Sequence, residues 1–417
     1  MRITLIRVII LVILIVSCSN NQTPLDGKSF LDRVASIEKM ELGDRIKAAD
    51  ILLDEIAEVG TPLYIGNNTA ILVARYDQDS LVLTGDMNRW QGNSVFKRID
   101  GTDLHYHQGE YEPNARLQYW LQRDPKVWPV VDSLNPFKVT NGFGAMSELV
   151  MPGYEYNPVF APFRDGQTSS LKGLDEHIIA EGVLPYTHNV HVWTPPDHLL
   201  SEVVGSIYLL DGAGYVSYAH MPTVLDALVK SGKIQPVIAV FVTPPNYEGS
   251  GEFTRETEYG MNPDFVKFMS DELVPYIDSK YSTGGGEAKS RLVLGDSYGG
   301  LGALYTAFLR PDVFGLAYSQ SGYVSFHKDS LITFFRESEK LNLKLALDIG
   351  TYETQIGSGY VYKREADFLT ANRRMRDCLI DQGYEIYYEE YPEGHTWGNW
   401  RQHLTVVLPW FYGQEML

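Results

Sequence analysis

The sequence predicts two structural parts, a smaller all-β immunoglobulin-like sandwich followed by a larger α/β domain with a mostly parallel central sheet. Three observations carry this prediction. Short apolar strands separated by polar turns recur at intervals of about 8–12 residues over residues 61–160. Strand and helix patterns then alternate over residues 170–417. Some strands of this second part are unbroken apolar runs, such as 237–242, which is typical of strands buried on both faces.

The composition limits the classes of function. The chain has 417 residues, with 35 Lys and Arg against 53 Asp and Glu, which gives a formal net charge of −18. A surface that binds a phosphate backbone needs an excess of basic residues, so nucleic acid is not an expected partner. Hydrophobic residues make up 44% and charged residues 21%, which is ordinary for a globular protein and excludes a disordered chain.

The first residues have the form of a signal peptide. Arg2 and Arg7 precede an apolar run at 8–16, which is too short for a membrane span of about 20 residues. The run ends in Ser17-Cys18, which resembles the bacterial lipobox. Residues 1–17 are therefore expected to be removed and Cys18 to be lipidated, which predicts a lipoprotein of the bacterial cell envelope, periplasmic or attached to the outer membrane. The membrane would be contacted through this lipid only; the alternative is an uncleaved apolar terminus with an incidental cysteine.

Cys378 is then the one remaining side-chain thiol of the mature protein. Neither an intramolecular disulfide nor a Cys-based metal site can be built from it. The surrounding residues have a helical pattern, so Cys378 is predicted to be a small buried hydrophobe.

The N-terminal elements follow from periodicity. Residues 25–60 form a helical lead-in, because apolar residues recur every three or four positions; an interruption near Gly43 predicts two short helices. Alternating patterns predict sandwich strands at 70–76, 80–85, 95–99, 104–107 and 116–121. A Pro- and Gly-rich passage at 130–162 is expected to separate the two parts.

The elements of the α/β domain alternate. The predicted strands are 176–183, 187–194, 203–210, 235–243, 291–295, 314–320, 343–349 and 385–391, and the predicted helices are 262–280, 299–309, 361–382 and 398–411.

A nucleophile motif directly follows one of the buried strands. Gly295-Asp296-Ser297-Tyr298-Gly299 lies between the strand 291–295 and the helix 299–309. A sharp strand-to-helix turn strains the backbone of the serine, and glycines two positions before and after it avoid clashes. The Ser297 hydroxyl is thereby exposed above the sheet, as in the α/β-hydrolase fold, and the Tyr298 N–H can stabilise an oxyanion. The alternative is a tight turn with an inert serine.

A serine hydroxyl needs a base to accept its proton, and on this fold the base comes late in the chain. His395 fits, because it lies in the loop that follows the last predicted strand. His403, on the next helix, is expected to be a surface residue, and His327 is a weaker competitor. His105 and His107 alternate along one strand, for which metal binding is the less favoured interpretation; no metal or organic cofactor is predicted.

The acid that orients the imidazole should come between the serine and the histidine. Glu353 lies past the end of the strand 343–349, whereas Asp348 lies within it, so Glu353 is favoured and Asp348 stays an alternative. The second oxyanion donor is expected from a small-residue loop after a buried strand, where Gly212 or Ala213 could present its N–H. An ordinary turn between strand and helix is the alternative there.

The C-terminal 240 residues resemble the putative-esterase family of α/β-hydrolases, which includes enterochelin (ferric siderophore) esterases, feruloyl esterases and mycolyltransferase-like antigens. The matching segments, in order, are 209–212 (LLDG), 255–259 (RETEY), 272–275 (ELVP), 295–300 (GDSYGG), 311–315 (PDVFG), 319–322 (SQSG) and 393–395 (EGH). The N-terminal part is similar to the early-set sandwich that precedes the hydrolase domain in enterochelin esterases and some feruloyl esterases, and 132–136 resembles the joining segment there.

This resemblance implies a serine esterase with Ser297 as nucleophile, His395 as base and Glu353 as acid. It also points to Arg255, Trp397, Trp400 and Arg401 as candidates for binding an ester substrate, either a small molecule or an oligosaccharide. Two departures are evident. Residues 355–360 look like an insertion near the pocket, and no basic cluster beyond Arg255 and Arg401 suits an anionic ferric siderophore.

Three functions follow, in order of preference. The first is hydrolysis of a siderophore ester, and the second is hydrolysis of feruloyl or acetyl esters on plant polysaccharide. The third is a non-catalytic glycan-binding protein, in which Trp90, Trp120 and Trp128 would stack on sugar rings; buried core or interface tryptophans are the commoner explanation for these residues.

Overall fold

The computed structural model describes residues 25–123, 128–163, 165–245, 254–354 and 367–413. The predicted signal peptide, the lipidation site Cys18 and the insertion-like segment 355–360 lie outside the described residues. In the part of the chain that is described, no helix combines the length and the apolar character needed to cross a membrane.

The N-terminal part contains two antiparallel sheets. Their strand orders are β1-β2-β6-β5 and β4-β3-β7-β9-β8. The strands are β1 (Leu63–Ile65), β2 (Thr69–Arg75), β3 (Val82–Gly85), β4 (Ser94–Val95), β5 (Lys97–Arg98), β6 (Leu104–Glu110), β7 (Arg116–Gln122), β8 (Lys138–Asn141) and β9 (Gly144–Val150). Leu72 of β2 packs into the core between the two sheets, whereas Ile71 and Val73 belong to a second core on the opposite face.

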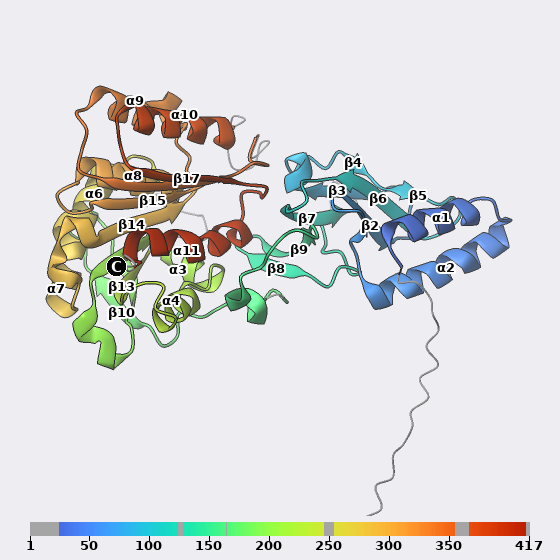
Figure 1. Cartoon of the computed structure of the whole chain (residues 1–417), viewed down its shortest axis with the longest axis horizontal. Coiled ribbons are helices and arrows are strands. Elements are labelled where there is room, and N and C mark those ends of the chain that lie inside the picture. The colour runs from blue at the N-terminus through green and yellow to red at the C-terminus, as the bar shows by residue number, and fades with distance from the viewer. Residues whose placement is uncertain (1–24, 124–127, 164, 246–253, 355–366, 414–417) are drawn as a thin grey trace, which may run out of the picture.

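The lead-in helices form the third layer of this part. They are α1 (Gly27–Ile37) and α2 (Leu42–Val59), and both contribute apolar residues to the second core on β2. The Asp26 carboxylate caps α1 by accepting a hydrogen bond from the Ser29 N–H at 2.8 Å. Figure 1 shows both helices on the side of the sandwich that faces away from the α/β domain. Burial on both faces explains why β2 lacks the alternation of a half-buried strand.

The passage at 130–162 is more structured than the sequence indicates. It was predicted to be a separator, but 138–150 forms the β8–β9 hairpin, and β9 pairs with β7 within the sandwich. Ser147 and Glu148 of β9 are polar yet fully buried, so the strand has no apolar pattern to recognise.

The C-terminal part is built on an eight-stranded sheet. Its order is β10-β11-β13-β12-β14-β15-β16-β17, with antiparallel pairing from β10 to β13 and parallel pairing from β13 to β17. The strands are β10 (Asp175–Ile179), β11 (His188–Trp193), β12 (Gly205–Leu210), β13 (Val237–Thr243), β14 (Arg291–Asp296), β15 (Leu316–Gln320), β16 (Lys344–Gly350) and β17 (Ile386–Tyr391). The predicted fold class, an all-β part before an α/β-hydrolase domain, is confirmed.

Helices cover both faces of this sheet. The α-helices are α3 (Gly212–Ser217), α4 (Met221–Lys230), α5 (Arg255–Tyr259), α6 (Pro263–Lys267), α7 (Val274–Lys280), α8 (Tyr298–Leu309), α9 (Phe326–Glu337), α10 (Phe368–Asp381) and α11 (Trp397–Tyr412), and a π-helical turn (Phe268–Leu273) joins α6 to α7. Short 3₁₀ helices lie at Asp86–Asn88, Pro158–Phe163, Asp197–Glu202, Gly284–Gly286 and Ala288–Ser290.

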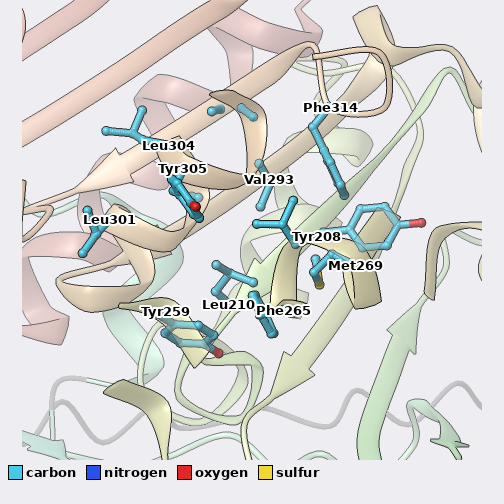
Figure 2. Close-up of a cluster of buried hydrophobic side chains, with 14 of the residues drawn as sticks. Tyr208, Leu210, Tyr259, Phe265, Met269, Val293, Leu301, Leu304, Tyr305 and Phe314 are labelled. Carbon is cyan, nitrogen blue, oxygen red and sulfur yellow. The ribbon is translucent and has the colours of Figure 1, made fainter. Parts of the chain in front are cut away.

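Each face of the sheet has its own apolar core. Tyr208 and Leu210 of β12 pack with α6 and α8 on one face, as Figure 2 shows, whereas Ile207 and Leu209 pack with α3, α4 and α11 on the other. Cys378 of α10 lies buried in the first core, which confirms its predicted place. Because β12 and β14 to β17 run parallel, the carboxyl ends of β12, β14, β16 and β17 present their loops along one edge of the sheet.

Candidate active site

Ser297 lies at a strained turn between β14 and α8. Its backbone has φ 55° and ψ −115°, a conformation that costs free energy in a residue other than glycine. Neighbouring segments hold the turn. The Ser297 N–H donates to the Gln320 carbonyl at 2.9 Å, and the Ser297 carbonyl accepts from Tyr323 N–H at 2.9 Å. Strain retained in this way is typical of a functional residue.

The glycines of the motif are required by close approach of backbone. A Cβ on Gly295 would lie 2.4 Å from the Gly299 carbonyl carbon, and one on Gly299 would meet the Asp211 carboxylate at 3.0 Å. Neither φ is in the left-handed region, so the need for glycine here is one of space. The sequence pattern Gly-x-Ser-x-Gly thus has the steric cause expected for it.

His395 is paired with Glu353. The imidazole Nδ1 lies 2.7 Å from Glu353 Oε2, so Nδ1 carries the proton that is donated and Nε2 is the nitrogen left to act on a serine hydroxyl. Ser297 follows β14, Glu353 follows β16 and His395 follows β17. All three therefore stand at the carboxyl edge of the parallel sheet, in the chain order of the α/β-hydrolase fold.

Glu353 is fully buried and held by two further donors. Its Oε1 accepts hydrogen bonds from the Ser321 hydroxyl at 2.6 Å and from the Gly350 N–H at 2.9 Å. Trp400 Nε1 donates to the Ser321 hydroxyl at 2.9 Å, and its ring packs edge-on against the His395 ring at a centroid distance of 5.0 Å. These contacts fix the orientation of both the carboxylate and the imidazole.

His403 is not on the surface, which corrects the sequence prediction. It is only 2% exposed and lies between Asp348 and Glu393, with ring nitrogens 3.3 Å from a carboxylate oxygen of each. Burial alone would lower the pKa of His403, but these two carboxylates raise it to about 9. α11 is buried around most of its circumference. Its sequence therefore shows no separate polar and apolar faces from which the burial of His403 could be predicted.

Asp348, the alternative acid, belongs to this second cluster. It accepts a hydrogen bond from the Tyr318 hydroxyl and faces His403 rather than His395. The weaker candidate base, His327, lies at the start of α9 with its ring against Phe326. The geometry of the described residues therefore brings Glu353, and not Asp348, to His395.

The two predicted oxyanion segments lie at neighbouring strand ends. Tyr298 is the first residue of α8, where its N–H has no acceptor within the helix. Gly212 is the first residue of α3, and a Cβ on it would lie 2.5 Å from the Phe241 carbonyl carbon, so only glycine fits. The Ala213 N–H donates to the Thr243 hydroxyl at 3.0 Å, which makes Gly212 the better donor of the two.

Arg255 ties these two segments together. Its Nε donates to the Asp211 carboxylate at 2.7 and 2.8 Å, and its Nη2 donates to the Asp296 carbonyl at 2.9 Å. Asp211 precedes Gly212 and Asp296 precedes Ser297. Burial raises the pKa of both carboxyl groups, and for Asp211 the Arg255 charge acts in the opposite direction. These hydrogen bonds give Arg255 a supporting role beside the candidate site, and its predicted role in binding substrate stays a prediction.

Three other residues predicted to bind substrate are buried, as are Ser297 and Glu353, and their role in binding stays a prediction. Trp397 packs against Tyr215, and Trp400 supports the His395 ring as described. Arg401 is 2% exposed and lies over the Phe160 ring. Burial lowers the pKa of Arg401 to about 10. All three lie on α11, most of whose residues are buried.

Of the sandwich tryptophans proposed for stacking, Trp90 and Trp120 are partly exposed and Trp128 is exposed. Trp90 and Trp120 pack edge to face, and their Nε1 atoms donate to Asp86 and to the Ala145 carbonyl. Trp128, 69% exposed, packs edge-on against Trp120. Edge-to-face packing leaves no flat platform of three rings.

Among the described residues, no group of three His, Cys, Asp or Glu side chains could hold a metal ion. His105 is fully buried on β6, and burial lowers the pKa of both His105 and His107.

Three residues of the site were missed by the sequence analysis. Ser321 supports Glu353, and Asp86 and Arg116 of the sandwich contact the loop that carries His395. The segment 319–322 gave a signal for Ser321, because it was one of the matching segments. For Asp86 and Arg116 no local pattern exists, since the loop that they contact is more than 270 positions away in the chain.

A shallow depression of about 610 Å³ lies between Tyr352 and the sandwich, lined on the sandwich side by Asn67, Asn68 and residues 110–113. The Tyr352 hydroxyl donates to Glu112 across it. Ser297 and His395 do not line this depression, so it is not the reaction site.

Comparison with known proteins agrees with this architecture. Residues 183–411 match the family model described as "Putative esterase". The iron(III) enterobactin esterase of Dickeya dadantii is 26% identical over 213 residues, a match that covers 48% of this chain and 46% of that protein. The iron(III) enterobactin esterase of Escherichia coli O6:H1 is 24% identical over 333 residues, covering 76% of each chain. The chain thus spans about half the length of the first of these relatives.

Solved structures resemble both parts of the chain. The ferric enterobactin esterase of Salmonella typhimurium superposes with a TM-score of 0.69 at 20% identity, covering 84% of this chain and 94% of that one. The enterobactin esterase of Shigella flexneri, crystallised in the presence of enterobactin, gives a TM-score of 0.67 at 22% identity, covering 84% and 95%. At these identities the likeness shows a shared fold, including the sandwich.

Proposed function

The chain belongs to the putative-esterase family, and on that premise we propose that it is a serine carboxylic ester hydrolase. The observation that carries the proposal is the Glu353–His395 pair at the same sheet edge as the strained Ser297 turn. A serine so placed has an imidazole as its base, and an acid orients that imidazole; this arrangement makes the serine hydroxyl a nucleophile.

The reaction would proceed through an acyl-enzyme. His395 Nε2 takes the proton of the Ser297 hydroxyl while the serine oxygen attacks the ester carbonyl, and Glu353 stabilises the imidazolium that forms. The N–H groups of Tyr298 and Gly212 would donate to the oxyanion. The imidazolium then protonates the departing alkoxide. Water, deprotonated by His395, attacks the acyl-enzyme, and the acid product leaves with Ser297 restored.

Labelling with a fluorophosphonate probe and turnover of p-nitrophenyl butyrate test this mechanism. The wild type should be labelled on Ser297 and should hydrolyse the ester, whereas Ser297→Ala should lose labelling and about 10⁴-fold or more of kcat. A Ser297→Ala variant that keeps most of the activity would refute the proposal. A wild type that binds glycans but is never labelled would favour the non-catalytic alternative.

We propose a siderophore ester as the leading substrate class. The relatives with matching sequence carry the name iron(III) enterobactin esterase, and the proteins with matching fold share the same pairing of sandwich and hydrolase domain. Both observations concern those proteins, so the substrate of this chain has to be measured.

A polysaccharide ester is the second candidate, favoured by the charges around the site. Arg255 is engaged by two acids and Arg401 is buried, so the described residues offer little exposed positive charge for a trianionic ferric siderophore. A panel of ferric enterobactin, methyl ferulate, feruloylated xylo-oligosaccharide and acetylated xylan, given to protein without residues 1–18, distinguishes the two. Turnover of the first alone supports the leading proposal, and turnover of the others alone overturns it.

We also propose that the protein is a lipoprotein of the bacterial cell envelope, attached through Cys18. The support is the charged, apolar and lipobox-like succession of residues 1–18. Radioactive palmitate should label the wild type and not Cys18→Ser, and equal labelling of both would contradict the proposal.

A further inference from the structure

The sandwich domain contacts the loop that carries His395 through main chain. Arg116, the first residue of β7, donates its backbone N–H to the Pro392 carbonyl at 3.2 Å and forms a parallel bridge with Glu393. Pro392 directly follows the end of β17. The sandwich strand thus pairs with the chain three residues before the proposed base.

The Arg116 side chain holds the same loop at both ends. Its guanidinium, 1% exposed as a residue, pairs with Glu148 of β9 and lies 3.4 Å from Glu393 Oε2. It also fills the space beside Gly398, where an added Cβ would lie 1.7 Å from Nη2. Glu393 and Gly398 flank His395 in the chain, so one guanidinium packs against both sides of the loop.

A second sandwich residue closes on the middle of the loop. The Asp86 carboxylate accepts hydrogen bonds from the Trp90 Nε1 at 3.0 Å and from the Gln118 N–H at 2.7 Å. A Cβ on Gly394 would lie 2.0 Å from Asp86 Cγ, so the carboxylate rests directly on this glycine. Gly394 immediately precedes His395.

The hydrolase domain also holds this loop. Glu393 Oε1 lies 3.3 Å from His403 Nε2, the Tyr352 N–H donates to the Glu393 carbonyl at 3.2 Å, and Asn399 Nδ2 donates to the Gly394 carbonyl at 3.0 Å. Removing Arg116 would leave Glu148 and Glu393 buried with one positive partner fewer. A buried carboxylate without its partner is costly, so the loop would move to relieve it.

We propose that Arg116 is a positioning residue for His395, and that the sandwich domain is therefore part of the catalytic apparatus and not an appended module. The inference rests on the proposed function, because it assigns Arg116 a role in orienting the base of that reaction. Displacement of a catalytic group by about 1 Å can cost about 100-fold in rate. The effect should appear in kcat and in the reactivity of Ser297, and not in KM, because Arg116 is fully buried and acts on the loop of His395.

The test measures the rate of Ser297 phosphonylation by a fluorophosphonate, and kcat and KM on p-nitrophenyl butyrate, in the full chain. Arg116→Met should lower the labelling rate and kcat by about 10- to 100-fold with KM unchanged. Arg116→Lys, which keeps the charge, should recover part of the loss. Arg291→Met is the matched control. Arg291 is also buried and ion-paired, 2.8 Å from Asp278, but it begins β14 at the opposite edge of the sheet.

Circular dichroism and thermal unfolding identify variants that have lost the fold. If Arg116→Met does not fold, Glu393→Gln, which keeps the shape and removes the charge, should lower the labelling rate by about 3- to 10-fold. Labelling of a folded Arg116→Met at the wild-type rate, or a loss no larger than that of Arg291→Met, overturns the inference and leaves the esterase proposal intact. A wild type that is never labelled overturns both.

Discussion

Two arginines, Arg116 fully buried and Arg255 partly buried, hold opposite sides of the candidate site, and they do so by different means. Arg255 joins the residues before Gly212 and Ser297, and all three segments belong to the hydrolase domain. Arg116 comes from the sandwich and holds the loop of His395. The proposed nucleophile and oxyanion donors are thus held by contacts within one domain, whereas the loop of the proposed base also contacts the other domain. Substitutions that remove the contacts of one arginine and keep those of the other should show how each set of contacts affects the reaction rate and the stability.

The largest effect is expected from a change in Glu353, the acid that pairs with the proposed base. Glu353→Gln should lower kcat by about 10³- to 10⁴-fold, because an amide cannot hold the imidazole in the correct tautomer or stabilise its positive charge. Asp348→Asn is the matched control, since Asp348 is an equally buried acid that faces His403 instead. Steady-state kinetics on p-nitrophenyl butyrate measure both; comparable losses would mean that the two acids share the role.

A smaller loss is expected on the nucleophile side. Arg255→Met should lower kcat by about 10- to 100-fold, because the segments that present the oxyanion donors lose their common tie. Its effect on stability should also grow with pH. Burial already raises the folded-state pKa values of Asp211 and Asp296 in the wild type, and loss of the Arg255 charge should raise them further. The difference between variant and wild type should therefore grow as the pH rises through the wild-type folded-state pKa values.

Urea unfolding of Arg255→Met and wild type at pH 4.5 and pH 7.5 measures that difference. The difference in the free energy of unfolding should be larger at pH 7.5. A difference that is the same at both pH values would show that Arg255 does not compensate the two acids.

The cluster behind the His395 loop should give the protein a pH-dependent stability. The folded-state pKa of His403 is raised to about 9 from 6.5. Its stabilising contribution is therefore complete below pH 6.5 and is lost as the pH rises through 9, with a total on the order of 1–3 kcal/mol. Urea unfolding from pH 6 to pH 9.5 should show this decline in the wild type, and His403→Gln should be less dependent on pH over the same interval.

The smallest effect is expected far from both supports. Cys378→Ala, in the core between α9 and α10, should cost about 1 kcal/mol in the free energy of unfolding, since it removes one buried sulfur. It should leave kcat unchanged, which makes it a measure of stability loss alone. A marked fall in activity would mean that the core on this face is coupled to the site.

The same contrast explains what the sequence could predict. Ser297, Glu353 and His395 each follow a strand with a readable apolar pattern, and the local constraints of a nucleophile turn are written in Gly295 and Gly299. The eight strands of the hydrolase sheet were recognisable for the same reason. Features that depend on one chain segment and its immediate neighbours are visible in the order of residues.

Features that depend on partners far away in the chain could not be predicted from the sequence. His403 was predicted to lie on the surface, because the sequence does not reveal that α11 packs against the hydrolase sheet and α4 and is buried around most of its circumference. The hairpin β8–β9 was not predicted, because its strand β9 contains the buried acid Glu148. Arg116 of another strand pairs with this acid, and the sequence does not show that pairing. Pairing of this kind becomes evident only when the segments are brought together.

The bridge between β7 and the segment after β17 also affects how the protein can be rebuilt by recombination or design. A hydrolase domain joined to a different sandwich would keep the contacts around Ser297 and lose those that the sandwich makes with the loop of His395. Exchange of N-terminal modules is therefore expected to succeed only where the incoming module supplies equivalents of Arg116, at the start of β7, and of Asp86, after β3.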